Sequence, residues 1–145
     1  MKSQQELSDR LEIQDQITAY SYAIDLHDWD ALDDIFTPDA SLDFTASGGE
    51  RGTRDELKPW LATSLDLFDG HQHLMGNTRV QFGADGDTAT SQTMCLNPMP
   101  LTHDGRQQLV LVGIWYADEW VRTPQGWRIT NRVQQKGFLH GLPAS

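Results

Sequence analysis

The sequence predicts an α+β fold, a cone-shaped curved sheet of mixed or antiparallel strands that wraps around a long N-terminal helix. Two observations lead to this prediction. Apolar residues in the first part of the chain recur at the three-and-four spacing of a helix face, whereas the second part reads as successive strands. Helices followed by a long antiparallel sheet are typical of the α+β class. A sheet wrapped around one helix encloses a deep apolar pocket, so we expect a small-molecule ligand.

The first helix has a clear start and one apolar face. Ser3 and Glu6 have the spacing of a capping box, in which each side chain satisfies a backbone N–H of the first turn. The apolar residues that follow at helical spacing are Leu7, Leu11, Ile13, Ile17, Tyr20 and Ile24. We therefore predict a long amphipathic helix over the first 25 residues or so.

Shorter elements follow the long helix. A second helix is predicted over residues 28–36, because Pro38 disfavours helix in the residue before it. A brief strand over residues 40–46 comes next. A second capping box opens a third helix, predicted over residues 53–68.

The rest of the chain predicts four strands separated by turn residues. They cover about residues 71–82, 88–96, 107–121 and 127–135. The third strand is apolar on both faces, as expected of a strand covered by helices on one side and lining a cavity on the other. No linker or repeat interrupts the pattern, so residues 1–145 are predicted to form a single domain.

Composition excludes several classes of partner. Eleven Lys and Arg against 21 Asp and Glu give a net charge of −10, which argues against nucleic acid and anionic membranes. The single cysteine, Cys95, excludes an intramolecular disulfide. No apolar run approaches the ~20 residues that span a bilayer, and the first residues do not resemble a signal peptide. We expect a cytoplasmic protein.

Asp25 and His73 are the candidate catalytic pair. Asp25 lies near the end of the long helix at the border of its apolar face, where it could point into the mouth of the pocket. His73 lies on the first predicted strand of the sheet. A carboxylate that accepts from one imidazole nitrogen leaves the other free as a proton acceptor and stabilises the imidazolium that forms. The alternatives are a surface carboxylate for Asp25 and a bond to a backbone carbonyl for His73.

A metal site is a third interpretation of the same region. His71 and His73 share one side of the predicted strand, and His27 or Asp25 could supply a further ligand. Because no motif marks that ligand, we expect neither a metal nor a cofactor. No motif marks a serine or cysteine nucleophile either, which favours proton abstraction with loss of a leaving group over acyl transfer.

Other side chains are assigned to the substrate. Arg132 on the last strand could hold an anionic or electronegative leaving group, or else be an arginine exposed on an edge or paired with a surface carboxylate. Tyr20 could offer its hydroxyl to a carbonyl, or else contribute packing. The pocket wall is expected to be apolar and aromatic, and Phe44, Met75 and Trp115 are predicted to contact the substrate.

Three stretches carry a resemblance to a known family: residues 13–44, the segment HQHLMGNTRVQF and the segment GWRITNR. Over nearly the whole chain, the sequence resembles SnoaL-like members of the nuclear-transport-factor-two-like superfamily, which are cystatin-like α+β barrels. It is similar to scytalone dehydratase and hexachlorocyclohexane dehydrochlorinase. The resemblance implies that Asp25 and His73 match their catalytic Asp–His dyad, and that Arg132 matches the arginine that assists chloride departure.

The chain also departs from both enzymes. Scytalone dehydratase polarises its substrate carbonyl with two tyrosines, and those positions hold Ile24 and Phe44 here. Its second catalytic histidine has no match, and Tyr20 stands where the dehydrochlorinase has a lysine. The resemblance therefore implies a retained base with a different electrophilic side, and it indicates neither substrate.

Residues and resemblance together predict a small cofactor-free lyase of the dehydratase type. It would eliminate water or another leaving group from a mostly apolar, ring-containing small molecule. The same dyad could instead drive isomerisation or cyclisation, and a non-catalytic binding protein would use the cone for a ligand alone. Since members of this family pair or trimerise through the outer face of the sheet, we expect a homodimer or homotrimer.

Overall fold

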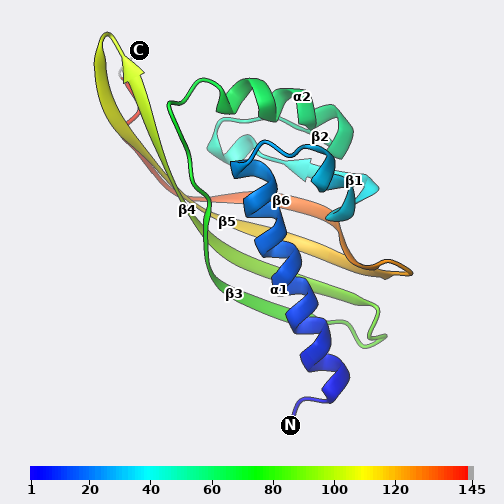
Figure 1. Cartoon of the computed structure of the whole chain (residues 1–145). Coiled ribbons are helices and arrows are strands. Elements are labelled where there is room, and N and C mark those ends of the chain that lie inside the picture. Colours follow the sequence, from blue (N-terminus) through cyan, green and yellow to red (C-terminus); the bar gives the residue numbers. More distant parts are fainter. Residues whose placement is uncertain (144–145) are drawn as a thin grey trace.

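The computed structural model describes residues 1–143 and contains two α-helices packed on one six-stranded sheet (Figure 1). The helices are α1 (Gln4–Asp25) and α2 (Arg54–Leu65), with short 3-10 turns η1 (Asp30–Asp34) and η2 (Thr45–Ser47). The strands are β1 (Phe36–Asp43), β2 (Arg51–Thr53), β3 (Leu74–Phe82), β4 (Thr88–His103), β5 (Arg106–Thr123) and β6 (Gly126–His140). The predicted α+β class is confirmed.

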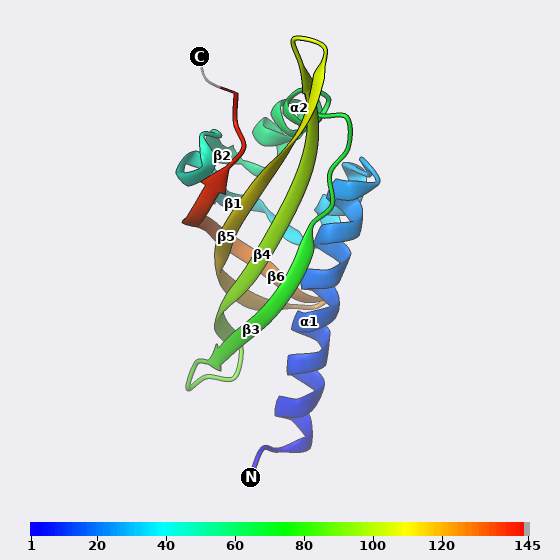
Figure 2. The same cartoon turned by 90° about the vertical axis from the view of Figure 1, so that its left-hand side faces the viewer.

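The sheet is mixed, curved and unclosed. Its strand order is β2-β1-β6-β5-β4-β3, and every neighbouring pair is antiparallel except β1 and β6, which are parallel. The β5–β6 register shifts at Gly113/Ile114 and again at Glu119/Trp120. Such irregularities bend a strand and increase its twist, which helps the sheet to curl around the helices. Figure 2 shows β3, β4 and β5 in front, with α2 behind them.

The inward face of α1 differs from its predicted apolar face in the first half of the helix. Ile13, Ile17, Tyr20 and Ile24 are fully or almost fully buried, at helical spacing. Leu7 and Leu11, predicted on the same face, are 50% and 67% exposed, because at about 100° per residue they point away from the face that buries Asp9 and Ile13. The inward face therefore runs from Asp9 to Ile24, and Asp25 follows at the end of the helix.

Strand β4 extends well past its predicted end and continues through Pro98 and Pro100 to His103. The carbonyls of these two prolines accept from Gln72 and Asp69, so their nitrogens face the segment before β3. Pairing with β5, on the opposite side, therefore needs no N–H from either proline. The extension matters because it brings Asn97 into the middle of a strand.

The remaining boundaries differ locally from the predictions. The second predicted helix is only the turn η1, and β1 starts at Phe36, with Pro38 inside the irregular stretch of the β1–β6 register. The short strand β2 was not predicted. Strand β6 continues to His140 because it pairs with the long first part of β5. Among the described residues, no helix is long and apolar enough to cross a membrane.

A partly buried ion pair holds α1 against the far end of the sheet. Both carboxylate oxygens of Asp9 accept from Arg122 at 2.8 and 2.9 Å, and Oδ1 also accepts from the indole of Trp127 at 3.1 Å. The hydrogen bonds from Arg122 exceed the opposing effect of burial and lower the pKa of Asp9 from 3.8 to about 2. The ionised carboxylate therefore stabilises the fold above the ordinary pKa of aspartate.

Replacing Asp9 should reveal this contribution in a defined pH range. We expect Asp9→Asn to lower the free energy of unfolding by about 2 kcal/mol at neutral pH. The difference from the unmodified protein should shrink as the pH falls from 3.8 toward about 2, because Asp9 then becomes protonated in the folded state. Urea denaturation across this range measures it. Asp15→Asn, at an exposed position of α1, is the matched control; an equal loss in both variants would contradict the assignment.

Candidate active site

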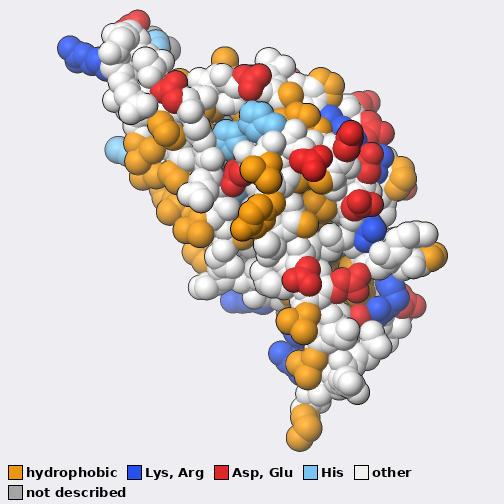
Figure 3. Space-filling model, in the orientation of Figure 1, with side chains coloured by type: hydrophobic (Ala, Val, Ile, Leu, Met, Phe, Trp, Pro, Cys, Tyr) orange, Lys and Arg blue, Asp and Glu red, His pale blue; other side chains and the backbone are white. Residues whose placement is uncertain are grey.

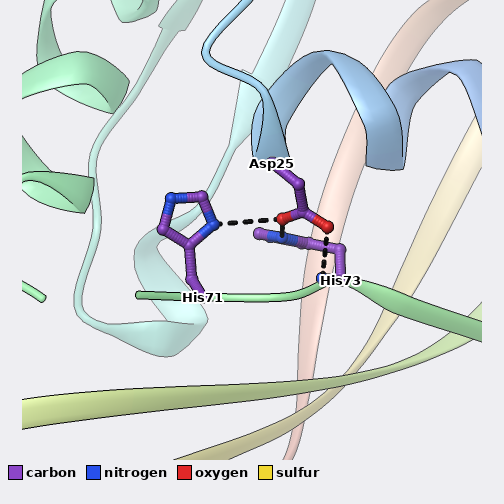
Figure 4. A group of neighbouring side chains, drawn as sticks. All are labelled: Asp25, His71 and His73. Carbon is purple, nitrogen blue, oxygen red and sulfur yellow. Dashed lines mark hydrogen bonds and ion pairs between the residues drawn. The ribbon is translucent and has the colours of Figure 1, made fainter. Parts of the chain in front are cut away.

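Asp25 and His73 meet in the structure as the sequence predicts (Figure 4). Asp25 is the last residue of α1, and His73 directly precedes β3. The Oδ1 atom of Asp25 lies 2.8 Å from Nδ1 of His73, and Oδ2 accepts from the backbone N–H of His73 at 2.8 Å. The imidazole is almost wholly buried, with 6% of its side chain exposed. Neither a surface carboxylate nor a histidine bonded to a backbone carbonyl describes this pair.

A second histidine binds the same carboxylate oxygen. His71 Nδ1 lies 3.0 Å from Asp25 Oδ1, and the side chain of His71 is as deeply buried as that of His73. Nε2 of His71 lies 2.8 Å from Nε2 of His27, at the surface end of the cluster. Figure 3 shows histidine side chains reaching the surface near the end of α1. The carboxylate therefore receives three N–H groups from two neighbouring residues of one segment.

The charge state of Asp25 determines which nitrogens carry protons. Burial opposes ionisation, but the hydrogen bonds and charge of His73, together with the bond from His71, hold the pKa of Asp25 below its usual value. An ionised carboxylate only accepts, so Nδ1 of each imidazole must donate. In neutral His73 the other nitrogen, Nε2, then carries a lone pair, and the amide of Asn97 lies 3.3 Å from it.

This lone pair faces a cavity of about 270 Å³ between the helices and the sheet, which is partly open to solvent. Its polar floor consists of Tyr20, His73, Asn97 and Tyr116. Most of its other lining residues are apolar and come from α1, α2, β4 and β5, with the stacked rings of Phe44 and Trp60 on one side. Ser47, Ser64 and Gln134 add polar groups to this lining. The side-chain oxygen of Asn97 is buried without a hydrogen-bond partner among the described residues. It is thus available to a ligand that carries a donor.

A buried cation lies behind two of the floor residues. The guanidinium of Arg132 lies 4.2 Å from the ring centroids of both Tyr20 and Tyr116. It is fully buried and forms a two-pronged pair with Asp118, at 2.7 and 2.8 Å. Burial opposes its charge, but Asp118 outweighs that effect and raises the pKa of Arg132, which stays cationic. Both sequence alternatives for Arg132, an exposed edge or a surface partner, are wrong.

The predicted substrate contacts divide into two groups. Tyr20 and Phe44 line the cavity beside His73, as predicted. Met75 and Trp115 are not among the residues that line it. Trp115 points to the outer face, because the inward positions of β5 are the even-numbered ones, and Tyr116 takes the place predicted for it. Met75 lies beside Asp25 in an outer hollow rather than in the cavity.

Three functional candidates were missed by the sequence reasoning. Asn97 precedes a proline and was placed at the end of a strand, so no pattern pointed to a pocket. Tyr116 was named only as part of an apolar alternation, although strand parity with Ile114 could have placed it inward. Asp118 had no signal of its own, because its partner Arg132 is directly opposite only in the β5–β6 register.

Asp25, His71 and His73 are also the residues that could hold a metal ion. One ligand atom from each lies within 4.8 Å of the others. Both Nδ1 atoms, however, already lie at hydrogen-bond distance from one carboxylate oxygen, at 2.8 and 3.0 Å. An ion bound there would have to replace both of these N–H protons. Hydrogen bonding alone accounts for the arrangement.

Comparisons with known proteins agree with this architecture. The SnoaL-like domain model matches residues 5–133. An uncharacterized protein of Mycobacterium tuberculosis is 49% identical over 138 residues, covering 95% of this chain and 92% of that protein. This similarity covers nearly the whole chain and not only the residues of the site.

Solved structures share the fold at low sequence identity. A hexachlorocyclohexane dehydrochlorinase from Novosphingobium barchaimii superposes with a TM-score of 0.79 at 19% identity, over 95% of this chain and 92% of that chain. A proposed scytalone dehydratase from Novosphingobium aromaticivorans gives 0.81 at 19%, over 97% and 92%. An NTF2-like protein with a cystatin-like fold from the same organism gives 0.68 at 24%, over 90% and 82%. The chain therefore belongs to the SnoaL-like domain family.

Proposed function

We propose that this protein is a cofactor-free lyase that eliminates water or another leaving group from a small ring-containing molecule. The observation that carries the proposal is the position of His73, which lines the cavity and whose Nδ1 lies 2.8 Å from Asp25 Oδ1. With the proton on Nδ1, the lone pair is on Nε2, where the amide nitrogen of Asn97 donates to it at 3.3 Å. A base held in this way removes a proton from a carbon next to an activating group, and Asp25 stabilises the imidazolium.

The floor of the cavity supports the electrophilic half of the reaction. Burial raises the pKa of Tyr20 and raises that of Tyr116 well above its ordinary value, so both hydroxyls stay protonated at neutral pH. They are suited to donate to a carbonyl or departing oxygen, and the cation of Arg132 behind them favours negative charge there. Arg132 is thus proposed to act through the tyrosines instead of touching the leaving group.

Proton balance fits a dehydration. His73 takes a proton from carbon, a carbon–carbon double bond forms, and the proton returns to the departing hydroxyl, which leaves as water. A thiol nucleophile is a poor competitor, because burial raises the pKa of Cys95 to about 12 and keeps the thiol protonated. The cavity of about 270 Å³ lies near the lower end of ligand pockets, roughly 300–1,000 Å³, which favours one small ring system.

Substitution of His73 tests the proposal. Cyclic β-hydroxy ketones and chlorinated cyclohexanes form the substrate panel, and the product double bond is followed by absorbance. We expect His73→Asn to lower turnover by about 10²–10⁴-fold without changing the melting temperature by more than a few degrees. His103→Asn, at the exposed end of β4, is the control. Turnover that survives His73→Asn at full rate would refute the role of this base.

The competing functions predict different results from the same panel. An isomerase or cyclase would return the proton, so reaction in D₂O would put deuterium into a product without loss of a group. A binding protein would bind panel members without converting any, and His73→Asn would change affinity alone. Elimination is the function we propose because hydrogen-bond donors for the leaving side, Tyr20 and Tyr116, accompany the base in one cavity.

The buried pair of Arg132 and Asp118 allows stability and function to be separated. Asp118→Asn leaves the guanidinium without its counter-charge and should lower the free energy of unfolding by about 3–5 kcal/mol. The double variant Arg132→Met with Asp118→Leu removes both charges and should recover most of that stability. Chemical denaturation and turnover are measured on all three proteins. If the double variant folds and keeps full turnover, the cation has no part in the reaction.

We also propose that the chain forms a homodimer or homotrimer through the outer face of the sheet. Large apolar side chains there are exposed to an unusual degree, by 39–61%: Leu74, Met94, Leu96 and Phe138. They surround an outer hollow of about 410 Å³. Figure 3 shows hydrophobic side chains along the edge where β3 and β4 lie. Contiguous apolar patches are uncommon on monomers.

Charged substitutions on this face test the assembly. We expect light scattering to give a dimer or trimer mass for the unmodified protein and a monomer mass for Met94→Lys with Phe138→Glu, because burying either charge at an apolar interface is unfavourable. Leu67→Lys, 70% exposed in the segment after α2, is the control. A monomer mass for the unmodified protein would contradict the proposed assembly.

A further inference from the structure

His27 has a backbone conformation that its residue type disfavours. It follows the C-cap of α1, and its φ of +57° lies in the left-handed region. Its N–H bonds to the carbonyl of Ile24, and the N–H of Asp28 bonds to that of Ala23, the two bonds of a Schellman motif. Glycine is the usual residue at this position because it lacks a Cβ. A histidine here suggests that its side chain is needed.

The side chain of His27 forms a hydrogen bond with that of His71, from Nε2 to Nε2. The two rings are coplanar, with an interplanar angle of 0°, and their Nε2 atoms lie 2.8 Å apart. The 5.1 Å between ring centroids equals that separation plus one ring radius on either side, so the rings meet edge to edge and are not stacked. In this geometry the two Nε2 atoms point at each other and share one proton in a hydrogen bond. They do not point toward a common third position, as two ligands of a metal ion would.

This geometry also indicates which ring nitrogens of the pair carry protons. Because the pKa of Asp25 is lowered, Nδ1 of His71 carries the proton that bonds to its carboxylate. In neutral His71, Nε2 is therefore an acceptor, and Nε2 of His27 must donate to it. His27 therefore reinforces the His71 tautomer that Asp25 requires, in which Nδ1 is the second imidazole donor to Asp25 Oδ1. The two side chains differ in burial: that of His27 is 38% exposed, and that of His71 is 6% exposed.

We propose that His27 and His71 are positioning residues that hold the carboxylate of Asp25 in line with His73. With His71 fixed, Oδ1 has two donors and Oδ2 has the backbone N–H of His73, so the carboxylate cannot rotate without breaking a bond. Nδ1 of His27 faces Asp66 at 3.9 Å, and the ring of Trp29 packs against its ring. The effect on turnover rests on the proposed function, whereas the effect on tautomers does not.

His27→Gly separates this role from a structural one. Glycine relieves the left-handed backbone, so we expect the melting temperature to hold or rise. Nevertheless, long-range ¹H–¹⁵N NMR spectra of the imidazole rings should show His71 changing from the Nδ1–H tautomer to a mixture. The same variant should lower kcat by about 10-fold, the smaller effect typical of lost orienting partners, with KM nearly unchanged.

Asp104→Gly is the matched control. Asp104, with a φ of +49°, is the other non-glycine residue described in the left-handed region, and it lies in the turn between β4 and β5. This variant relieves the same kind of strain and should leave the His71 tautomer and kcat unchanged. An Nδ1–H tautomer of His71 that persists in His27→Gly, or an unchanged kcat, would overturn the proposal. If turnover instead survives His73→Asn, the lyase function fails, while the His71 spectra still test the effect of His27 on the tautomer of His71.

Discussion

The hydrogen bonds received by the carboxylate of Asp25 are the interaction on which the site depends. They join the end of α1 to the segment that leads into β3, two parts of the chain nearly 50 residues apart. Because the donors are N–H groups, they keep the carboxylate ionised and orient His73 at the same time. The helix packing that places Asp25 there comes from Ile17, Tyr20 and Ile24 on the same face of α1. Core packing and the position of the base therefore have a common origin.

A buried ion pair lies behind the tyrosines of the cavity floor. Arg132 and Asp118 are opposite each other on β6 and β5, so the sheet register itself forms the pair. The cation contacts the faces of Tyr20 and Tyr116, and those rings separate it from the cavity. A charge in this position acts over a short distance without taking space from a ligand. The pair itself is fully buried, and a low-dielectric surrounding strengthens such an effect.

Much of this arrangement could be predicted from the sequence, for definite reasons. Asp25 and His73 were found because a polar residue at the edge of an apolar helix face is conspicuous and because the family resemblance pointed to the same pair. Phe44 and Tyr20 followed from the same patterns. The α+β class followed from helical periodicity in one part of the chain and strand patterns in the other.

Other features depend on tertiary structure and left no local signal. Asn97 reaches the cavity only because β4 continues through two prolines whose nitrogens face away from β5. Trp115 was assigned to the substrate although the inward side of β5 is occupied by Tyr116, since an apolar pattern on both faces does not reveal which is inside. The bond between His27 and His71 needs a left-handed residue after α1, which local propensity disfavours.

A neutron crystal structure at neutral pD would test the central claim most directly, because it locates the protons themselves. The account predicts deuterons on Nδ1 of both His71 and His73, none on the oxygens of Asp25, and a bare Nε2 of His73 facing the cavity. A deuteron on Nε2 of His73 with a bare Nδ1, or a protonated Asp25, would contradict it. The lone pair proposed as the base would then not exist in the resting protein.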